Sequence, residues 1–310
     1  MWYNKKILKE KVNYLNLLSG DLRISITNVC NMKCTYCHNE GVQSQYSELS
    51  LNDVIYIINE SKKYGVKSVR ITGGEPLIHK DVFEIFKSVK TNHPDLQLGI
   101  NTNAIEIDIL LKIINKKYID RAVVGIDYFD SNVSKNSLIG SSSSAILENI
   151  LKIKNAGCRV DLSTVYNDEM GHINKLIKWC FKNRIRIKIL EHITGEVDTT
   201  PSQPYIEMMK RMIQNYNLQL GFDVTRKQYF ATSVDGNVVS FFHSHCRIRE
   251  CDICTRLHLR ISSQGKTKSC LFGNTPEFSL LYGNFDENFL LGLSFLGVSP
   301  KNEAIRGEKN

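Results

Sequence analysis

Short runs of β-branched and other apolar residues alternate along the chain with longer segments whose apolar residues recur at helical spacing. This alternation extends from residue 22 to residue 190 and is typical of repeated βα units around a parallel sheet. Six βα units are therefore expected. The runs predicted as strands are residues 22–27, 67–72, 96–100, 122–126, 159–165 and 186–190.

The segment after residue 50 has the clearest helix start and stop signals. Ser50 is followed three residues later by Asp53, which is a capping-box pattern. Gly65 stands just after ESKKY, at a position where glycine commonly ends a helix. The spacing predicts one helix between these two signals.

Six such units fall short of the eight that close a TIM barrel. We therefore predict an α/β fold with a partial, open (β/α)6 TIM-like barrel in residues 21–194, preceded by an N-terminal segment, residues 1–20. The alternation of strand and helix patterns stops after about residue 195, and TTPSQPY (199–205), rich in Pro, Ser and Thr, interrupts the regular elements. One helical stretch (206–217) and short β-like pieces follow, so residues 195–310 are predicted to form a C-terminal extension available to cover the open side of the barrel.

The composition narrows the class of protein. Of 310 residues, 42% are hydrophobic and 23% charged, which excludes a disordered chain. No run of about 18 uncharged apolar residues occurs and the first residues lack a secretory signal, so a cytoplasmic location without membrane association is expected. The net charge of +8 is spread along the chain. It favours an anionic substrate about as well as it indicates a solvated basic surface.

Polar residues follow the predicted strands at their carboxyl ends, where parallel β/α folds place their chemistry. Core packing would not produce this distribution, so we predict a site at that rim. The segments concerned are TNVCNMKCTYCHNEG after the first strand, GGEP (73–76), NTN (101–103), Asp127, and Glu191 with His192. For Asp127, binding a ribose hydroxyl, accepting a proton and capping a helix are all open roles.

Nine cysteines in a chain without an export signal do not indicate a disulfide framework. Three of them suit an iron–sulfur centre or a soft metal; a structural zinc with His38 as a further ligand is the alternative. These three form a C-x3-C-x2-C pattern: Cys30, Cys34 and Cys37. A second set, C-x2-C-x15-C, is again more typical of a metal site than of core residues, and consists of Cys251, Cys254 and Cys270. Cys158 and Cys180 are expected in the core.

The C-x3-C-x2-C pattern with Tyr36, followed one βα unit later by GGEP, resembles the radical S-adenosylmethionine (SAM) superfamily. The resemblance implies that Cys30, Cys34 and Cys37 hold three irons of a [4Fe–4S] cluster. The fourth iron would be left for SAM, and Tyr36 would contact SAM. It further implies that Gly73, Gly74, Glu75 and Pro76 bind the methionine end of SAM. An iron without a protein ligand is an open coordination site for such a cosubstrate, and consecutive glycines allow its close approach.

Together with the second cysteine set, LRISITNVCNMKCTYC and ITGGEPL resemble the GTP 3′,8-cyclase family of molybdenum-cofactor biosynthesis, from about Asp21 to Phe272. The resemblance implies a second [4Fe–4S] cluster on Cys251, Cys254 and Cys270. It implies substrate contacts from Arg23, Arg70 and Arg256, the last also in a catalytic role, since guanidinium groups match phosphate geometry. It places further cofactor-binding positions at Asn101, Gly125, Glu191 and Ile193.

Several pocket positions differ from that family. Asp161 stands where the family has a lysine, Lys188 and His258 replace arginines, and Asn101 and Gly125 replace hydroxyl residues. Asp161, Lys188 and His258 are still predicted to face the substrate. A carboxylate near a triphosphate is unfavourable unless it is paired or remote. The chain also ends IRGEKN instead of Gly-Gly, and its last cysteine spacing is two residues longer than the usual one. We predict retained radical chemistry with a rebuilt substrate pocket.

The second cluster has a further ligand available in the sequence. Cys246 lies five residues before Cys251, within HSHC, beside His243 and His245. If Cys246 or a histidine closes that cluster, the cluster cannot bind substrate through an open iron.

The sequence thus predicts a two-cluster radical SAM enzyme that acts on a small anionic or nucleotide-like molecule. It would receive electrons from a donor such as flavodoxin or ferredoxin. One alternative is a radical SAM enzyme of specialised metabolism that modifies a peptide, amino sugar or nucleoside. A non-catalytic iron–sulfur or zinc protein is the alternative of another class, although GGEP argues against it. No nucleic-acid motif is present, so no nucleic-acid partner is expected.

Overall fold

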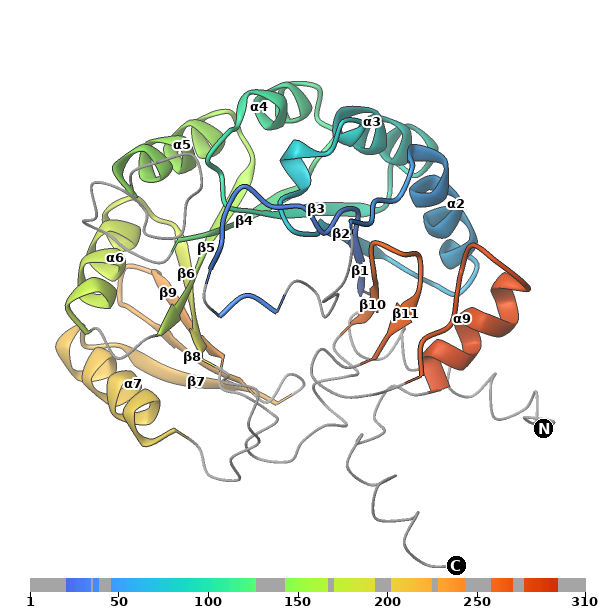
Figure 1. Ribbon diagram of the computed structural model, residues 1–310. Coiled ribbons are helices and arrows are strands. Elements are labelled where there is room, and N and C mark those ends of the chain that lie inside the picture. Colours follow the sequence, from blue (N-terminus) through green and yellow to red (C-terminus); the bar gives the residue numbers. More distant parts are fainter. Residues whose placement is uncertain are drawn as a thin grey trace, which may run out of the picture.

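A computed structural model describes residues 21–34, 36–38, 46–126, 143–166, 170–192, 202–224, 228–242, 258–269 and 276–294. A strongly curved sheet forms an open barrel, and the helices cover its outer, convex face (Figure 1). Among the described residues, no helix is long and apolar enough to cross a membrane.

The parallel strands lie close to the positions that the apolar runs predict. The strands are β1 (Asp21–Ser25), β2 (Ser68–Thr72), β3 (Gln97–Thr102), β4 (Arg121–Gly125), β5 (Arg159–Tyr166), β6 (Arg186–Glu191), β7 (Gln219–Asp223), β8 (Gln228–Thr232), β9 (Val238–Phe242), β10 (Leu259–Ile261) and β11 (Thr267–Lys268). The helices are α2 (Leu51–Lys62), α3 (Val82–Asn92), α4 (Asp108–Asn115), α5 (Ser143–Asn155), α6 (Met170–Lys182), α7 (Gln203–Asn215) and α9 (Phe285–Ser294), with the 3-10 turn η2 (Pro76–Ile78).

The sheet order is β11-β10-β1-β2-β3-β4-β5-β6-β9-β8-β7. β1 to β6 pair in parallel with their chain neighbours, and β10 and β9 add parallel strands outside β1 and β6. β11 and the β8–β7 pair are antiparallel at the two edges. Within the part of the chain that the structure describes, the two edges do not pair with each other, which confirms the open, partial barrel. The described strands of the C-terminal extension lengthen the sheet at both ends.

Side chains alternate between the two faces of each strand. Leu22, Ile24, Ile71, Ile100 and Leu162 are essentially inaccessible and belong to one apolar core between the sheet and its helices. The residues between them, such as Arg23 and Arg70, therefore face the inside of the barrel. This alternation gives the barrel an apolar outer layer and a polar lumen.

The predicted signals at the first helix are confirmed. Ser50 is the N-cap of α2, and Ser50 and Asp53 make both hydrogen bonds of a capping box. Gly65 adopts a left-handed φ of 81° just beyond the helix, a conformation that glycine tolerates best.

The turn after β2 packs directly against the chain that leaves β1. The Gly74 amide donates to the Thr27 carbonyl at 2.7 Å, and the Glu75 amide donates to the Val29 carbonyl at 2.8 Å. A Cβ atom on Gly74 would lie 2.1 Å from the Val29 carbonyl oxygen. Only a residue without a side chain fits there, because both neighbours are backbone.

Gly74→Ala is predicted to destabilise the protein by about 1–3 kcal/mol, the usual cost of forcing an extra carbon into a packed site. Thermal unfolding would measure the difference. Gly171→Ala is the matched control, since a Cβ there meets nothing within 4 Å and the site is helical. Equal stability of the two variants would contradict the packing described for Gly74.

Candidate functional site

The segment after β1 is held on both sides before it reaches the first cysteine. On one side it pairs with Gly74 and Glu75; on the other, Asn28 N donates to the Ser47 carbonyl and Leu49 N to the Ile26 carbonyl. Ser47 N in turn donates to Asn28 Oδ1 at 2.9 Å. These bonds close the base of the loop that carries the cysteines, so the loop starts and ends at fixed points.

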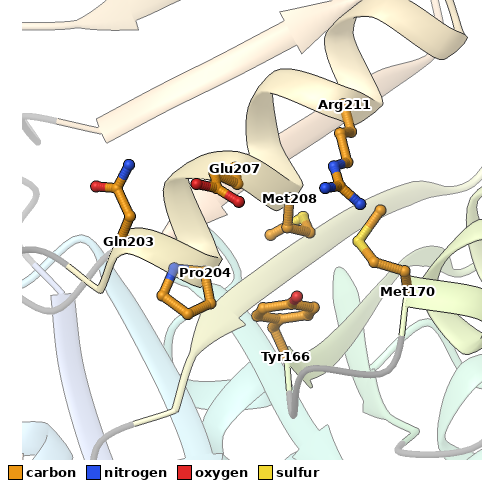
Figure 2. A pocket seen from close by; sticks show the side chains of 7 residues that line it. All are labelled: Tyr166, Met170, Gln203, Pro204, Glu207, Met208 and Arg211. Atoms are coloured by element: carbon orange, nitrogen blue, oxygen red, sulfur yellow. The ribbon is translucent and has the colours of Figure 1, made fainter.

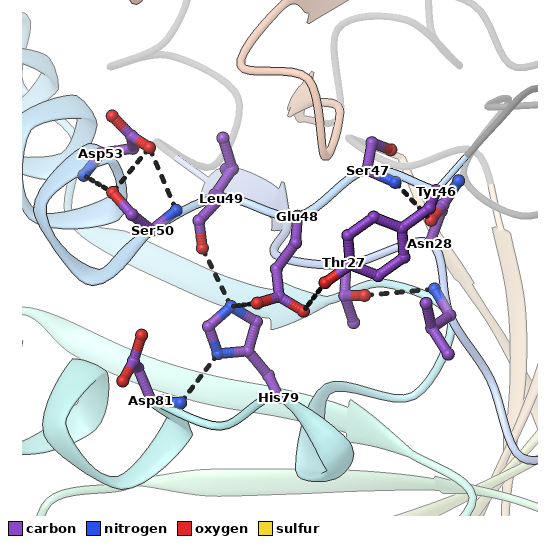
Figure 3. A network of polar contacts seen from close by, with 11 residues as sticks. Thr27, Asn28, Tyr46, Ser47, Glu48, Leu49, Ser50, Asp53, His79 and Asp81 are labelled. Atoms are coloured by element: carbon purple, nitrogen blue, oxygen red, sulfur yellow. Dashed lines mark hydrogen bonds and ion pairs between the residues drawn. The ribbon is translucent and has the colours of Figure 1, made fainter.

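A buried histidine joins this base to the turn after β2 (Figure 3). His79 Nε2 lies 2.9 Å from the Leu49 carbonyl and 3.5 Å from Glu48 Oε1, while its Nδ1 accepts a hydrogen bond from Asp81 N. A proton on Nε2 is consistent with all three contacts. His79 therefore ties the start of α3 to the residues just before α2.

The three cysteines of the first set lie together in this loop. Cys30 and Cys34 are partly buried and Cys37 is exposed. Cys37 N donates to the Cys34 carbonyl, which closes a turn between these two, and Met32 N donates to Cys30 Sγ at 3.3 Å. Burial raises the pKa of the Cys30 thiol to about 11.

Within the described residues, no three His, Cys, Asp or Glu side chains converge as the ligands of a single metal ion do. A four-iron cluster takes one thiolate per iron, at separate corners. The donor set of three thiols in one loop, with an exposed member, fits such a cluster better than a single ion. Beside the loop, Gly74 has no side chain and lets the backbone of the turn after β2 lie close to the chain that carries the cysteines.

Glu75 connects the turn after β2 to the end of β3. Its carboxylate is buried and accepts hydrogen bonds from Leu77 N at 3.0 Å, Thr102 Oγ1 at 2.7 Å and Asn103 N at 2.7 Å. Burial raises the pKa of this carboxyl to about 7, against the lowering effect of the three donors. All of these contacts are made within the protein, so the structure gives Glu75 a positioning role.

The end of β3 also reaches the cysteine loop. Asn103 Nδ2 donates to Asn31 Oδ1 at 2.6 Å, next to Cys30. Two polar atoms here, Asn31 Nδ2 and Asn101 Oδ1, are buried and make no hydrogen bond to any described residue. Buried polar atoms are normally paired. An unpaired donor and acceptor beside the loop fit a polar ligand such as SAM.

Other predicted cofactor residues lie at the same rim. The Tyr36 ring lies 6.1 Å from the His192 ring, edge to face, which places the cysteine loop near the end of β6. Gly125 is exposed at the end of β4. Glu191 is buried and accepts a hydrogen bond from Ser202 N at 3.2 Å, just before α7. His38 is exposed in the same loop.

The predicted substrate arginines are neighbours on the inner face of the sheet. Arg23 in β1 stands in register with Arg70 in β2 and with Arg260 in β10. His258 immediately precedes β10 and lies two residues before Arg260. Because side chains alternate along a strand, these two residues belong to the same face. Sequence reasoning missed Arg260, although its alternation with the apolar Leu259 and Ile261 was a usable signal.

Asp161 and Lys188 lie on the inner face farther round the barrel. Asp161 is 1% exposed, and its carboxylate accepts two hydrogen bonds from Arg186, both at 3.0 Å. Arg121 also donates to it, and Lys188 Nζ lies 3.8 Å from it. Asp161 is thus paired, which meets the condition under which a carboxylate is compatible with an anionic substrate nearby. Arg121 and Arg186 were not identified from the sequence.

Some predicted residues lie outside the described part of the chain: Cys246, Cys251, Cys254, Cys270, Arg256, Ile193 and Asp127. Cys158 and Cys180 are buried in the apolar core, as predicted.

A cavity of about 450 Å³ lies beside this rim, between the end of β5 and α7 (Figure 2). Tyr166, Met170 and Met208 form its apolar wall, and Gln203, Glu207 and Arg211 its polar edge. None of the residues predicted from the sequence lines this cavity.

Comparison with known proteins agrees with this geometry. The "Radical SAM superfamily" family model matches residues 24–180. A protein named "Probable GTP 3′,8-cyclase" from Methanococcus aeolicus is 27% identical over 258 residues, which cover 81% of this chain and 84% of the relative. A GTP 3′,8-cyclase from Campylobacter jejuni is 25% identical over 274 residues, 84% of this chain and 81% of the relative.

The fold is also that of a solved enzyme. Streptococcus suis SuiB, in its structure with S-adenosylmethionine, superimposes with a TM-score of 0.67 at 18% identity, over 100% of this chain and 75% of SuiB. The family match covers half of the chain and contains the end of β1, the cysteine loop, the glycine turn and the strands β2 to β5, so this chain belongs to the radical SAM superfamily.

Proposed function

We propose that this radical SAM enzyme holds two [4Fe–4S] clusters and abstracts hydrogen from a small anionic or nucleotide-like substrate. Its similarity in sequence to GTP 3′,8-cyclases supports this proposal. One observation carries the proposal: the cysteine loop is fixed over a lumen whose inner face presents Arg23, Arg70 and Arg260. A cationic lumen below a reactive centre suits an anionic substrate.

Cys30, Cys34 and Cys37 would hold the first cluster, which leaves one iron without a protein ligand for the amino and carboxylate groups of SAM. When bound and reduced, this cluster supplies the electron that cleaves SAM to a 5′-deoxyadenosyl radical. A one-electron donor such as flavodoxin or ferredoxin would deliver that electron. A barrel wall around bound substrate would limit the access of water, which protects a radical from side reactions.

The chain's own residues would position SAM beside the loop. Gly73, Gly74 and Pro76 would contact its methionine end from the turn after β2, whose backbone is held against the chain leaving β1. Tyr36 and Asn101 would add ring and polar contacts at the rim. Glu75 would fix the glycine turn to the end of β3 through its hydrogen bonds from Thr102 and Asn103, while the bond from Leu77 N holds the turn itself. Gly125 and Glu191, at the ends of β4 and β6, belong to the proposed set. Ile193, two residues after Glu191 in the sequence, completes it.

The second cluster is proposed on Cys251, Cys254 and Cys270, with Arg256 beside it to bind and polarise the substrate. The support is the spacing of these cysteines and the extent of the similarity to GTP 3′,8-cyclases, which covers four-fifths of the chain. β10 begins five residues after Cys254 and pairs with β1, so the segment that carries two of these cysteines leads directly into the barrel wall.

The reaction is tested by anaerobic incubation of the reconstituted, dithionite-reduced protein with SAM, with and without GTP. Substrate-dependent 5′-deoxyadenosine together with a new GTP-derived product is the expected result for cyclase chemistry. Slow formation of 5′-deoxyadenosine at a rate that GTP does not change would support the radical chemistry and reject GTP as the substrate. Absence of 5′-deoxyadenosine under all conditions would reject the radical reaction itself.

Chemical analysis tests the two clusters. About eight iron atoms and eight labile sulfides per chain are expected, four for each cluster. Cys34→Ser and Cys254→Ser should each lower the count to about half, whereas Cys158→Ala, in the apolar core, should leave it unchanged. Zinc without labile sulfide would rule out both clusters, and a full count of about four in the unmodified protein would remove the second.

Glu75→Gln is predicted to destabilise the protein by about 1–3 kcal/mol at pH 8, where the carboxylate is ionised and accepts all three hydrogen bonds. A glutamine amide has one acceptor oxygen, and its NH2 group would face a donor. Denaturant unfolding measures the loss, and iron analysis should show weaker retention of the first cluster. Glu148→Gln, at an exposed position in α5, is the control. Unaltered stability and iron content in Glu75→Gln would contradict the positioning role.

A further inference from the structure

Helix α7 carries an apolar row of side chains and, beside it, a charged pair. Tyr205, Met208 and Met212 are buried and recur at the spacing of one helical face. Glu207 and Arg211 are exposed and lie about one helical turn apart along the border of that face. The helix therefore presents an acid and a base next to apolar side chains.

The cavity between the end of β5 and α7 has walls that the protein itself holds in place. Ser202 N donates to the Glu191 carboxylate at 3.2 Å, just before α7 begins, and the Tyr205 hydroxyl donates to the Ile189 carbonyl at 2.6 Å. The Tyr205 ring also meets the Tyr166 ring edge to face, with 6.1 Å between the centroids. These contacts anchor α7 to β6 and β5, so the cavity is formed before a ligand enters, which lowers the cost of binding.

The apolar wall suits a bulky side chain. Tyr166, Met170 and Met208 form this wall of a cavity of about 450 Å³, a volume within the range of small-molecule sites. Methionine side chains adapt to the shape of a ligand, and their sulfur atoms make favourable contacts with aromatic rings. An aromatic or large aliphatic group would fit here.

The polar edge offers one charge of each sign. Glu207 and Arg211 have the spacing of a helical ion pair, yet neither makes a hydrogen bond or an ion pair with any residue that the structure describes. Figure 2 shows their charged groups on opposite sides of Met208. A guanidinium group binds a carboxylate, and a carboxylate accepts hydrogen bonds from an ammonium group.

The balance of charge also narrows the class of ligand. Among the described residues that line the cavity, one side chain is acidic and one is basic, so together they carry no net charge. A phosphate group near Arg211 would also lie near the Glu207 carboxylate, which repels it. A ligand with one positive and one negative group gains from both side chains.

We propose that this cavity binds a free α-amino acid with a bulky apolar side chain. Arg211 would bind the carboxylate of the amino acid and Glu207 its ammonium group. The side chain of the ligand would lie against Tyr166, Met170 and Met208. None of these five residues belongs to the proposed SAM or substrate set, so the cavity is a second ligand site and goes beyond the proposed function.

The test is a ligand-observed NMR titration of the reconstituted full-length protein with L-phenylalanine, without reductant and with SAM in excess. SAM occupies the proposed open iron, which could otherwise bind amino and carboxylate groups itself. Three analogues each lack one feature: N-acetyl-L-phenylalanine the ammonium group, L-phenylalaninamide the carboxylate and glycine the side chain. Each is expected to bind about fivefold more weakly than L-phenylalanine, or weaker still.

Variants assign the two charged contacts. Glu207→Gln should remove the preference for L-phenylalanine over its N-acetyl derivative, and Arg211→Gln the preference over the amide. Each should weaken binding of L-phenylalanine about fivefold. Both positions are exposed, so the variants are expected to fold. Lys210→Gln, exposed on α7 outside the cavity, and Glu148→Gln, exposed on α5, are matched controls that should bind like the unmodified protein.

Three outcomes would overturn the proposal. The first is an unmodified protein without saturable binding of L-phenylalanine. The second is equal affinity for L-phenylalanine and its two derivatives, which would indicate an apolar cavity without charge recognition. The third is a loss in Lys210→Gln as large as that in Arg211→Gln. Because the titration measures binding and not turnover, failure of the radical reaction would leave its result unchanged.

Discussion

The close approach of the Gly73–Gly74 backbone to the chain leaving β1 is the contact on which the candidate site depends. It places two βα loops at backbone-to-backbone distance, so that Thr27 and Val29 accept hydrogen bonds from the glycine turn. The cysteine loop starts at that point. Glu75 then extends the connection to β3, and Asn103 returns it to Asn31. The ends of β1, β2 and β3 are thus linked to one another by hydrogen bonds that restrict each of the three loops.

Much of this could be predicted from the sequence, because the relevant signals are local. Apolar runs of five to seven residues located the six parallel strands β1 to β6, because the length of a run and the helical spacing between runs are both set by neighbouring residues. The cysteine loop and the GGEP turn were found for the same reason. Ser50 and Asp53 form their capping box within a single turn of chain.

The rest depended on contacts between distant residues, which local patterns do not encode. β10 is three residues long and gives no periodic signal, so its place beside β1 could not be predicted. The partners of Asp161 follow from the register of β4, β5 and β6, and a single sequence does not specify register. Asp161 therefore looked like an obstacle to anion binding, whereas in the folded chain it is surrounded by cations.

The pairing of β10 with β1 also bears on the order in which the protein is assembled. Residues 259–261 complete the hydrogen bonding of residues 22–24, so during synthesis one edge of the first strand stays uncovered until more than 230 further residues have been made. Exposed strand edges are prone to pair with other chains. The cysteines at 251 and 254 precede β10 in the sequence, so binding of the proposed second cluster and coverage of the first strand would both come late in the synthesis of the chain. Mature, cluster-loaded protein would therefore be less prone to edge-to-edge aggregation than newly made chains.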